Sequence, residues 1–331
     1  MLKTFSTGTD CALPESLWQA CVTLADAAFV LGDKRVAASS LEAALPYAEQ
    51  LADARLGRTL NRLGVLRAQA GQHAEAERAF KRAIANIRMT AGPDHPELAT
   101  YVSNLAAVYE ADGKREHAVA QYEHALAIYE RHGACNTDAA RSLDALGRLY
   151  AAGGNDVKAL YALRRALSLK EAALGAGDWD TGVTREKLGE FYFRQGRHNE
   201  AEPYFWNSVA IRAKALGDGD PALWRLYARL ARLYAGQKKY HRAEQLLRYA
   251  IQLLSAAQMP DHSRIVTELC ALEQIYRQMG RFSQADAIAE LIEALASDPA
   301  EAGNTLKIEF AGPPPQPGNL FSVGKHHFES A

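Results

Sequence analysis

A pair of histidines flanked by glutamates is the first feature that could carry chemistry. His117 and His124 lie seven residues apart, and a glutamate precedes each of them in a segment with a helical pattern. Two imidazoles on one helix face can bind a transition metal, but metal-binding helices usually place their ligands about three or four residues apart. We therefore expect a solvent-exposed helix face here and no metal site.

Two further segments suggest chemistry at first sight. "GAGDWDTG", residues 175–182, is rich in glycine, as are many loops that bind phosphate. It lacks the preceding strand and the glycine spacing of a nucleotide-binding loop, so we expect a connection between two helices. His326 and His327 are adjacent and would make only a weak metal site. No serine, cysteine or lysine has a recognisable catalytic partner. We therefore expect that the protein has no catalytic residues, binds no cofactor and is not an enzyme.

The overall charge limits the classes of partner. Lysine and arginine together number 38 against 39 acidic residues, and the net charge of −1 gives no electrostatic reason to expect nucleic acid. The first ten residues lack the apolar run of a secretory signal, and no segment has the length of a membrane span. The cysteines show neither a zinc-site spacing nor a disulfide framework: Cys11, Cys21, Cys135 and Cys270. We expect a cytoplasmic chain without a nucleic-acid or membrane partner.

A repeated pattern determines how these residues must be positioned. Residues 63–84, "LGVLRAQAGQHAEAERAFKRAI", return in altered form as residues 105–126, "LAAVYEADGKREHAVAQYEHAL". A leucine followed thirteen residues later by an alanine occurs seven times, at steps of 39, 42, 41, 42, 42 and 42 residues. The pairs are Leu24 and Ala37, Leu63 and Ala76, Leu105 and Ala118, Leu146 and Ala159, Leu188 and Ala201, Leu230 and Ala243, and Leu272 and Ala285. Such regularity predicts one supersecondary unit used repeatedly.

Each unit is predicted to form two antiparallel helices, because apolar and small residues recur at helical spacing on both sides of a central turn. The turn residues are Gly32, Gly71, Gly113, Gly154, Gly196 and Gly280, with Lys238 in the sixth unit. Buried alanines are expected at the helix crossings, namely Ala118, Ala159 and Ala201, with Phe80, Tyr122 and Phe205 filling the space beside them. One pair cannot bury all of its apolar surface, so the units must stack into a solenoid.

The order of residues in the units resembles the tetratricopeptide repeat. Its pattern is almost complete in Leu188, Gly189, Tyr192, Gly196, Ala201 and Phe205. That repeat is usually about 34 residues long, whereas the step of about 42 residues here is similar to the longer kinesin-light-chain type. The resemblance implies an all-α superhelical solenoid of seven antiparallel helix pairs over residues 14–297. Residues 1–13 would then be an N-terminal leader, and residues 298–331 an extended, proline-rich C-terminal tail.

The connections between units carry their own signals. In "AGPDHPELAT", residues 91–100, Gly92 and Pro93 are expected to end one helix, and Asp94 with Glu97 to form a capping box for the next. Two later connections repeat this restart with Asp220-Pro221 and Asp261-His262. The first unit lacks such a connection, and we interpret it as an N-terminal cap.

The last helix and the tail raise a question of coverage. We expect a final helix over residues 283–296, whose apolar residues have no further unit to cover them: Ile288, Leu291, Ile292 and Leu295. The segment with Leu306, Ile308 and Phe310 alternates as a strand does and could fold over that end. The alternatives are an unstructured tail and self-association of the chain through its C-terminal end.

The resemblance implies a protein-interaction scaffold or adaptor that binds a peptide or a partner surface on its concave face, which the first helix of each unit lines. The candidate residues there are Asn61, Val65, Ser103, Glu110, Arg141, Arg148, Glu186, Glu190, Phe193, Arg225, Arg232, Gln274 and Arg277. Two arginine pairs are each spaced by seven residues and flank Glu186 and Glu190 in the sequence of units. Either these charges neutralise one another, or the arginines clamp carboxylates of a partner segment while Phe193 supplies an apolar contact.

Two other functions remain compatible with the pattern. One is a regulatory or sensor subunit whose solenoid responds to a small ligand or a short peptide. The other is an enzyme with a site dispersed over several repeats, for which the sequence offers no constellation of catalytic groups.

Overall fold

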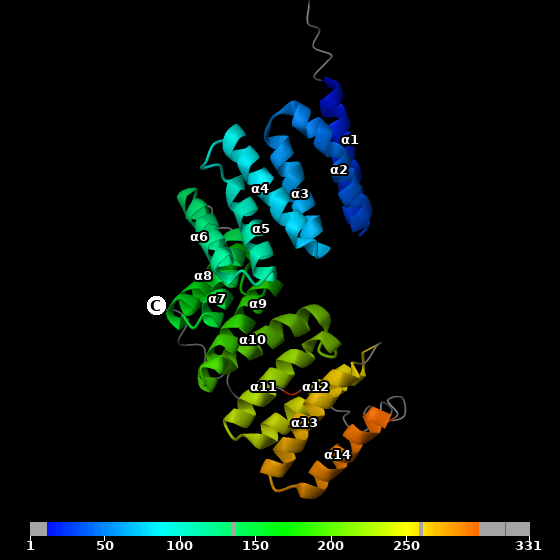
Figure 1. Cartoon of the computed structure of the whole chain (residues 1–331). Coiled ribbons are helices and arrows are strands. Elements are labelled where there is room, and N and C mark those ends of the chain that lie inside the picture. The colour runs from blue at the N-terminus through cyan, green and yellow to red at the C-terminus, as the bar shows by residue number, and fades with distance from the viewer. Residues whose placement is uncertain (1–11, 134–136, 258–260, 298–314, 316–331) are drawn as a thin grey trace, which may run out of the picture. The chain divides into compact units, whose positions relative to one another are not determined.

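The computed structural model describes residues 12–133, 137–257, 261–297 and 315 of the chain, and helices are the regular elements of this part (Figure 1). The leader and the tail predicted from the sequence lie almost entirely outside the described residues. The α-helices are α1 Ala12–Val30, α2 Lys34–Leu51, α3 Ala54–Gln69, α4 His73–Thr90, α5 Glu97–Ala111, α6 Arg115–Arg131, α7 Thr137–Ala152, α8 Asp156–Leu174, α9 Trp179–Arg194, α10 His198–Leu216, α11 Trp224–Gly236, α12 Tyr240–Ser255, α13 His262–Gln278 and α14 Phe282–Ser297. A short 3-10 helix, Pro221–Leu223, precedes α11.

The chain divides into two compact units, Met1–Leu169 and Lys170–Ala331, and the boundary falls within α8. In the first unit α1 packs on α2, α3 on α4 and α5 on α6, and each pair also contacts the next along the chain. In the second unit α9 packs on α10, α11 on α12 and α13 on α14, again with contacts between consecutive pairs. The predicted helix pairs and their order are therefore confirmed.

The turns inside the pairs have the geometry that their residues predict. All six predicted turn glycines have positive φ, between 72 and 80°. At Gly71 the chain closes the helix by a bond from the Gln72 amide to the Arg67 carbonyl, at 2.9 Å. Lys238 occupies the same place in the sixth repeat and adopts φ 58°, a conformation that favours glycine.

The helix crossings are built from small residues, as predicted. The alanines of the seven pairs are all 0 or 1% exposed. A methyl group at Gly64 would lie 2.8 Å from the ring of Phe80, and one at Gly189 would lie 2.9 Å from the ring of Phe205. The first helix therefore lies so close to the second that its backbone contacts an aromatic side chain of the second helix.

The leucine of the first repeat is an exception to the pattern. Leu24 is 55% exposed, whereas Leu63, at the equivalent position of the second repeat, is 1% exposed. Leu63 is buried in a cluster with Val22, Ala25 and other residues of the preceding helix pair. The described residues hold no helix pair before α1, so Leu24 has no such surface to pack on and stays exposed.

The capping box predicted for α5 was wrong. Glu97 is the first residue of α5, and its amide donates to His95 Nδ1 at 3.3 Å, not to Asp94. The Asp94 carboxylate pairs with Arg131 instead, and Glu97 accepts hydrogen bonds from Arg58 at 2.7 Å and from the Tyr101 hydroxyl at 2.9 Å. Asp94 and Glu97 thus form ion pairs with arginines of neighbouring helices instead of the predicted bonds at the start of α5.

The other predicted connections are confirmed. The Asp220 carboxylate accepts from the Ala222 amide at 2.7 Å, and Asp261 accepts from the Arg264 amide at 3.2 Å. In the glycine-rich segment 175–182, residues 175–178 join α8 to α9 and the rest begin α9. Asp178 caps α9 by accepting from the Asp180 amide. The segment is a helix connection, as the sequence indicated.

The last helix buries three of the four apolar side chains that the sequence analysis named. Ile288, Leu291 and Leu295 are 3 to 8% exposed, Ile292 is half-buried, and α14 packs on α13. The proposed cap, Leu306, Ile308 and Phe310, lies outside the described residues.

The crossings allow a direct test with two alanines of α6. Ala118 is 0% exposed at a crossing, while Ala120 lies on the exposed side of the same helix. Ala118→Leu should lower the free energy of unfolding by about 1 to 3 kcal/mol because the helices must move apart. Ala120→Leu should change it by less than about 0.5 kcal/mol. Urea unfolding followed by circular dichroism measures both, and equal effects would contradict the register of the repeats.

Candidate functional site: the first-helix face

Polar side chains join the first helices of neighbouring repeats in the first unit. We call the side of α3, α5 and α7, and of α9, α11 and α13, that carries the predicted partner-binding residues the first-helix face. On it the Asn104 amide donates to Asn61 Oδ1 at 2.9 Å, and the hydroxyls of Ser103 and Ser142 are 2.9 Å apart. These contacts connect α3 to α5 and α5 to α7.

Charged pairs continue this arrangement. Arg148 of α7 pairs with Glu110 of α5, whose side chain is only 15% exposed. Arg58 of α3 binds Glu97 of α5, and its hydrogen bond is the main cause that lowers the pKa of this carboxyl from its ordinary value. The predicted residue Arg148 thus links two repeats through its ion pair, although its own side chain is exposed.

A pocket opens beside this face, between α1 and α3, with α2 contributing to its lining. Its volume is about 360 Å³. It is lined by Ala25, Asp26, Phe29, Ala37, Leu41, Asn61, Arg62, Val65 and Leu66. Phe29 is 54% exposed, and Asp26 and Arg62 form an ion pair. The structure therefore brings the predicted Asn61 and Val65 to one pocket with an accessible aromatic ring.

The remaining predicted residue of the first unit is more accessible. The side chain of Arg141 is 71% exposed, and the nearest carboxylate oxygen, on Asp138, is 3.7 Å from its guanidinium. This geometry holds Arg141 loosely, so its donors are available to solvent.

In the second unit the two predicted glutamates already have basic partners. Glu186 accepts a hydrogen bond from Arg212 at 2.5 Å and a second from Arg229. Arg229 also approaches Glu190, at 3.3 Å. Arg212 in turn lies over the ring of Trp179, with 5.0 Å between guanidinium carbon and ring centroid. The acidic residues are therefore neutralised within the second unit.

Arg232 has an acidic partner that is almost fully buried. It donates to Glu268 of α13 at 2.6 Å, and the Glu268 side chain is 2% exposed. Burial raises the pKa of Glu268 above its ordinary value, and the nearby Arg232 opposes this shift. Removing Arg232 would leave a buried carboxylate without its partner, so this arginine stabilises the fold.

Three other predicted residues occupy more open positions. Arg225 is exposed and lies 5.6 Å from the ring of Trp224. Phe193 is half-buried, with its ring 5.3 Å from that of His198. Arg277 is paired with Glu273 at 2.8 Å within α13, and Gln274 is exposed beside it. Of these, Arg225 offers the least encumbered positive charge.

Sequence reasoning missed several residues that line the pocket or form ion pairs with residues of the face: Asp26, Phe29, Arg58, Arg62, Arg212 and Arg229. One sequence signal could have indicated the pair of Glu186 with Arg229. The two residues are 43 positions apart, which is one repeat plus one position, so they lie on equivalent parts of neighbouring repeats. In the part of the chain that the structure describes, no cluster of three or more histidines, cysteines or carboxylates could hold a metal ion. No helix there is long and apolar enough to cross a membrane.

Comparison with known proteins shows which kind of repeat this chain resembles. The model of the tetratricopeptide repeat matches residues 55–131 and 180–256. Protein kinesin light chain-related 1 of Arabidopsis thaliana is 26% identical over 137 residues, which is 41% of this chain and 22% of that protein. The chain thus spans less than a quarter of the relative's length.

Two solved structures share the fold. BtubC (BKLC) from P. vanneervenii aligns with a TM-score of 0.57 at 20% identity, covering 73% of this chain and 91% of that one. A signal transduction ATPase with a tetratricopeptide repeat sensor, from Pyrococcus horikoshii, aligns with a TM-score of 0.68 at 16% identity. That match covers 89% of this chain and 44% of the ATPase. At these identities the likeness concerns the fold alone.

The buried carboxyl of Glu268 predicts a pH dependence of stability. Its folded pKa lies above the ordinary value of 4.5, so between these two values the folded protein binds more protons than the unfolded one. The unfolding free energy of wild type relative to Glu268→Gln should therefore fall as pH rises above 4.5. Urea titrations across this range measure the difference, and a difference that grows with pH would contradict the assignment.

Glu97→Gln provides the control, because the contribution of Glu97 to stability should change with pH in the opposite direction. The folded pKa of Glu97 is lowered from 4.5 by Arg58, so its contribution to stability is present above 4.5 and lost as pH falls through the folded value. The difference between wild type and Glu97→Gln should thus shrink on acidification.

Proposed function

Because the chain carries tetratricopeptide repeats of the kinesin-light-chain type, we propose that it is a scaffold or adaptor that holds a peptide or partner surface on its first-helix face. Proteins built from these repeats generally mediate protein–protein interactions, and they are typically not enzymes. Stacked helix pairs offer a surface formed before binding, which reduces the ordering cost of association.

The pocket between α1 and α3 is the observation that carries this proposal. It combines an accessible aromatic ring, Phe29, with the half-buried Val65 and the amide of Asn61. An apolar side chain of a partner would bury the ring, while Asn61 would fix the orientation of the partner backbone. The ion pair of Arg62 with Asp26 lies beside it and supplies a polar rim.

The arginines of the face contribute unequally in this proposal. Arg148 and Arg232 connect repeats through Glu110 and Glu268, so they position the face and contact a partner only through their exposed edges. Arg141 and Arg225 are the charges that would bind carboxylates of the partner. Glu186, Glu190, Phe193 and Arg277 would contribute further contacts on the second unit.

The cytoplasm is the proposed location of this scaffold. The two cysteines that the structure describes, Cys21 and Cys270, are free thiols, as suits a reducing compartment. No nucleic-acid or membrane partner is part of the proposal, because the chain as a whole is almost neutral.

A regulatory or sensor subunit is the second candidate. The same pocket is lined by Leu41, Leu66 and Val65 and has a volume of about 360 Å³, which is enough for a small apolar ligand. Binding there would change the contact between the first two helix pairs.

Site-specific photocrosslinking separates these functions. A benzophenone amino acid placed at Phe29, or at Arg141, should crosslink a stoichiometric protein partner in the source cell. The same group at Met89, which is 86% exposed on the second helix of the second repeat, serves as the control and should not. Crosslinks from Met89 alone would move the binding site off the first-helix face. Thermal stabilisation by a metabolite that Phe29→Ser abolishes would favour the sensor.

A further inference from the structure

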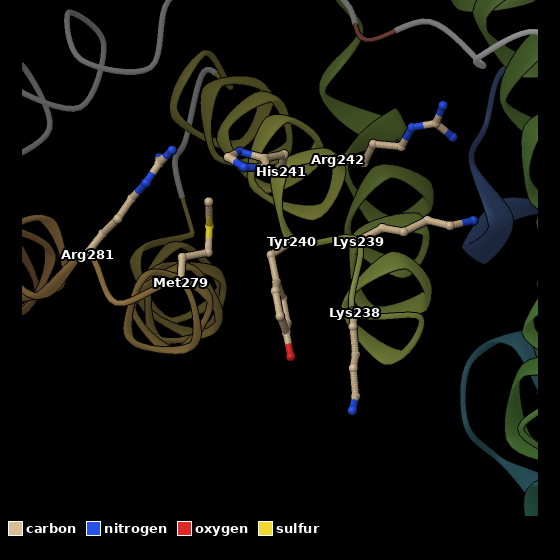
Figure 2. Close-up of a pocket in the computed structure, with 7 residues that line it drawn as sticks. All are labelled: Lys238, Lys239, Tyr240, His241, Arg242, Met279 and Arg281. Atoms are coloured by element: carbon tan, nitrogen blue, oxygen red, sulfur yellow. The ribbon is translucent and has the colours of Figure 1, made fainter.

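A second pocket lies away from the first-helix face, between the α11–α12 turn and the α13–α14 turn of the second unit (Figure 2). Its volume is about 570 Å³. The residues that line it are Lys238, Lys239, Tyr240, His241, Arg242, Met279 and Arg281. We call it the basic turn pocket, since five of its seven residues carry basic side chains and none is acidic.

The basic residues differ in whether a carboxylate already neutralises them. Arg281 is 3.2 Å from Glu244, and His241 is 4.0 Å from the same carboxylate. Lys238, Lys239 and Arg242 are exposed, and in the described part of the chain no carboxylate pairs with any of them. These three positive charges therefore face solvent.

Tyr234 fixes the position of two of these charges. The Lys239 ammonium and the Arg242 guanidinium lie 5.6 and 5.5 Å from its ring centroid. The Tyr234 hydroxyl donates to the buried Glu202 at 2.5 Å and accepts from Trp206 Nε1 at 3.2 Å, so the ring is held in place. The cations are thus arranged before any partner arrives.

Equivalent turns in other repeats neutralise their cations. Lys114 of the third repeat is 3.0 Å from Asp112, and Arg197 of the fifth is 2.5 Å from Glu200. The first turn of α12 holds no acidic residue, although it follows two lysines and contains Arg242. Positive charge at the positive end of a helix is unfavourable, and a bound anionic group would relieve this. Since the net charge of the chain is −1, the excess here is local.

We propose that the basic turn pocket is a docking surface for an acidic segment of a partner protein. The half-buried Tyr240 and Met279 separate the basic groups and offer apolar contact, which suits an extended peptide with acidic and apolar side chains (Figure 2). A nucleic acid would need a longer basic track along its backbone than these two turns provide. The inference is independent of the first-helix face.

Binding of a fluorescein-labelled hexaglutamate peptide, followed by anisotropy, tests the proposal on the full chain. The variant Lys239→Ser/Arg242→Ser removes two of the free charges and should weaken binding by about ten-fold or more. The matched control, Lys34→Ser/Arg35→Ser, removes two exposed cations beside the turn of the first repeat and should bind as wild type does. A hexaglutamine peptide should not bind.

Lys238→Gly is a second variant, and we expect it to fold at least as stably as wild type because Lys238 has a positive φ. It removes a charge and also places glycine at a positive φ, so it should raise the melting temperature while weakening hexaglutamate binding. Equal loss of binding in the pocket variant and in the first-repeat control would overturn the proposal, as would no binding to wild type. Tighter binding of oligodeoxythymidylate than of hexaglutamate would overturn it in favour of nucleic acid.

Discussion

The close approach of the two helices in each repeat is the constraint on which the rest of the structure depends. A small residue on the first helix lies against a large side chain of the second, as Gly64 does against Phe80 and Gly189 against Phe205. Where the first helix carries no side chain, the aromatic ring packs on its backbone, and this contact sets both the spacing and the rotation of the pair. Every outward-facing residue is placed by that rotation.

The surfaces of the repeats differ in how many of their charged side chains are already paired. On the first-helix face, polar contacts between neighbouring repeats occupy many of the charges, such as Arg148 with Glu110 and Arg232 with Glu268. Accessible groups then remain at the positions where this pairing stops, including Phe29 and Arg225. The α11–α12 turn departs from its equivalents in a similar way, because its cations lack carboxylates. We propose that partners bind at these departures from the repeat.

Periodicity explains which features could be predicted from the sequence. The turn glycines, the buried alanines and the place of Lys238 follow from contacts inside one repeat, so the pattern of a single unit determines them. The exposure of Leu24 does not follow from the pattern, because burial at this position depends on a preceding helix pair. The α5 cap was wrongly predicted because Glu97 pairs with Arg58 of a neighbouring helix. At the candidate site, the pattern of the first helices indicated positions such as Asn61 and Val65, but it did not indicate the ion-pair partners of the charged residues. Arg229 was missed since its carboxylate lies one repeat away in the chain.

A double-mutant cycle at Gly189 and Phe205 tests the central constraint most directly. In the wild-type background Gly189→Ala should lower the free energy of unfolding by about 1 to 3 kcal/mol, because its methyl group would lie 2.9 Å from the Phe205 ring. In the Phe205→Ala background the same change should be neutral or stabilising by up to about 1 kcal/mol, since alanine favours helix more than glycine does. An equal cost in both backgrounds would contradict the account.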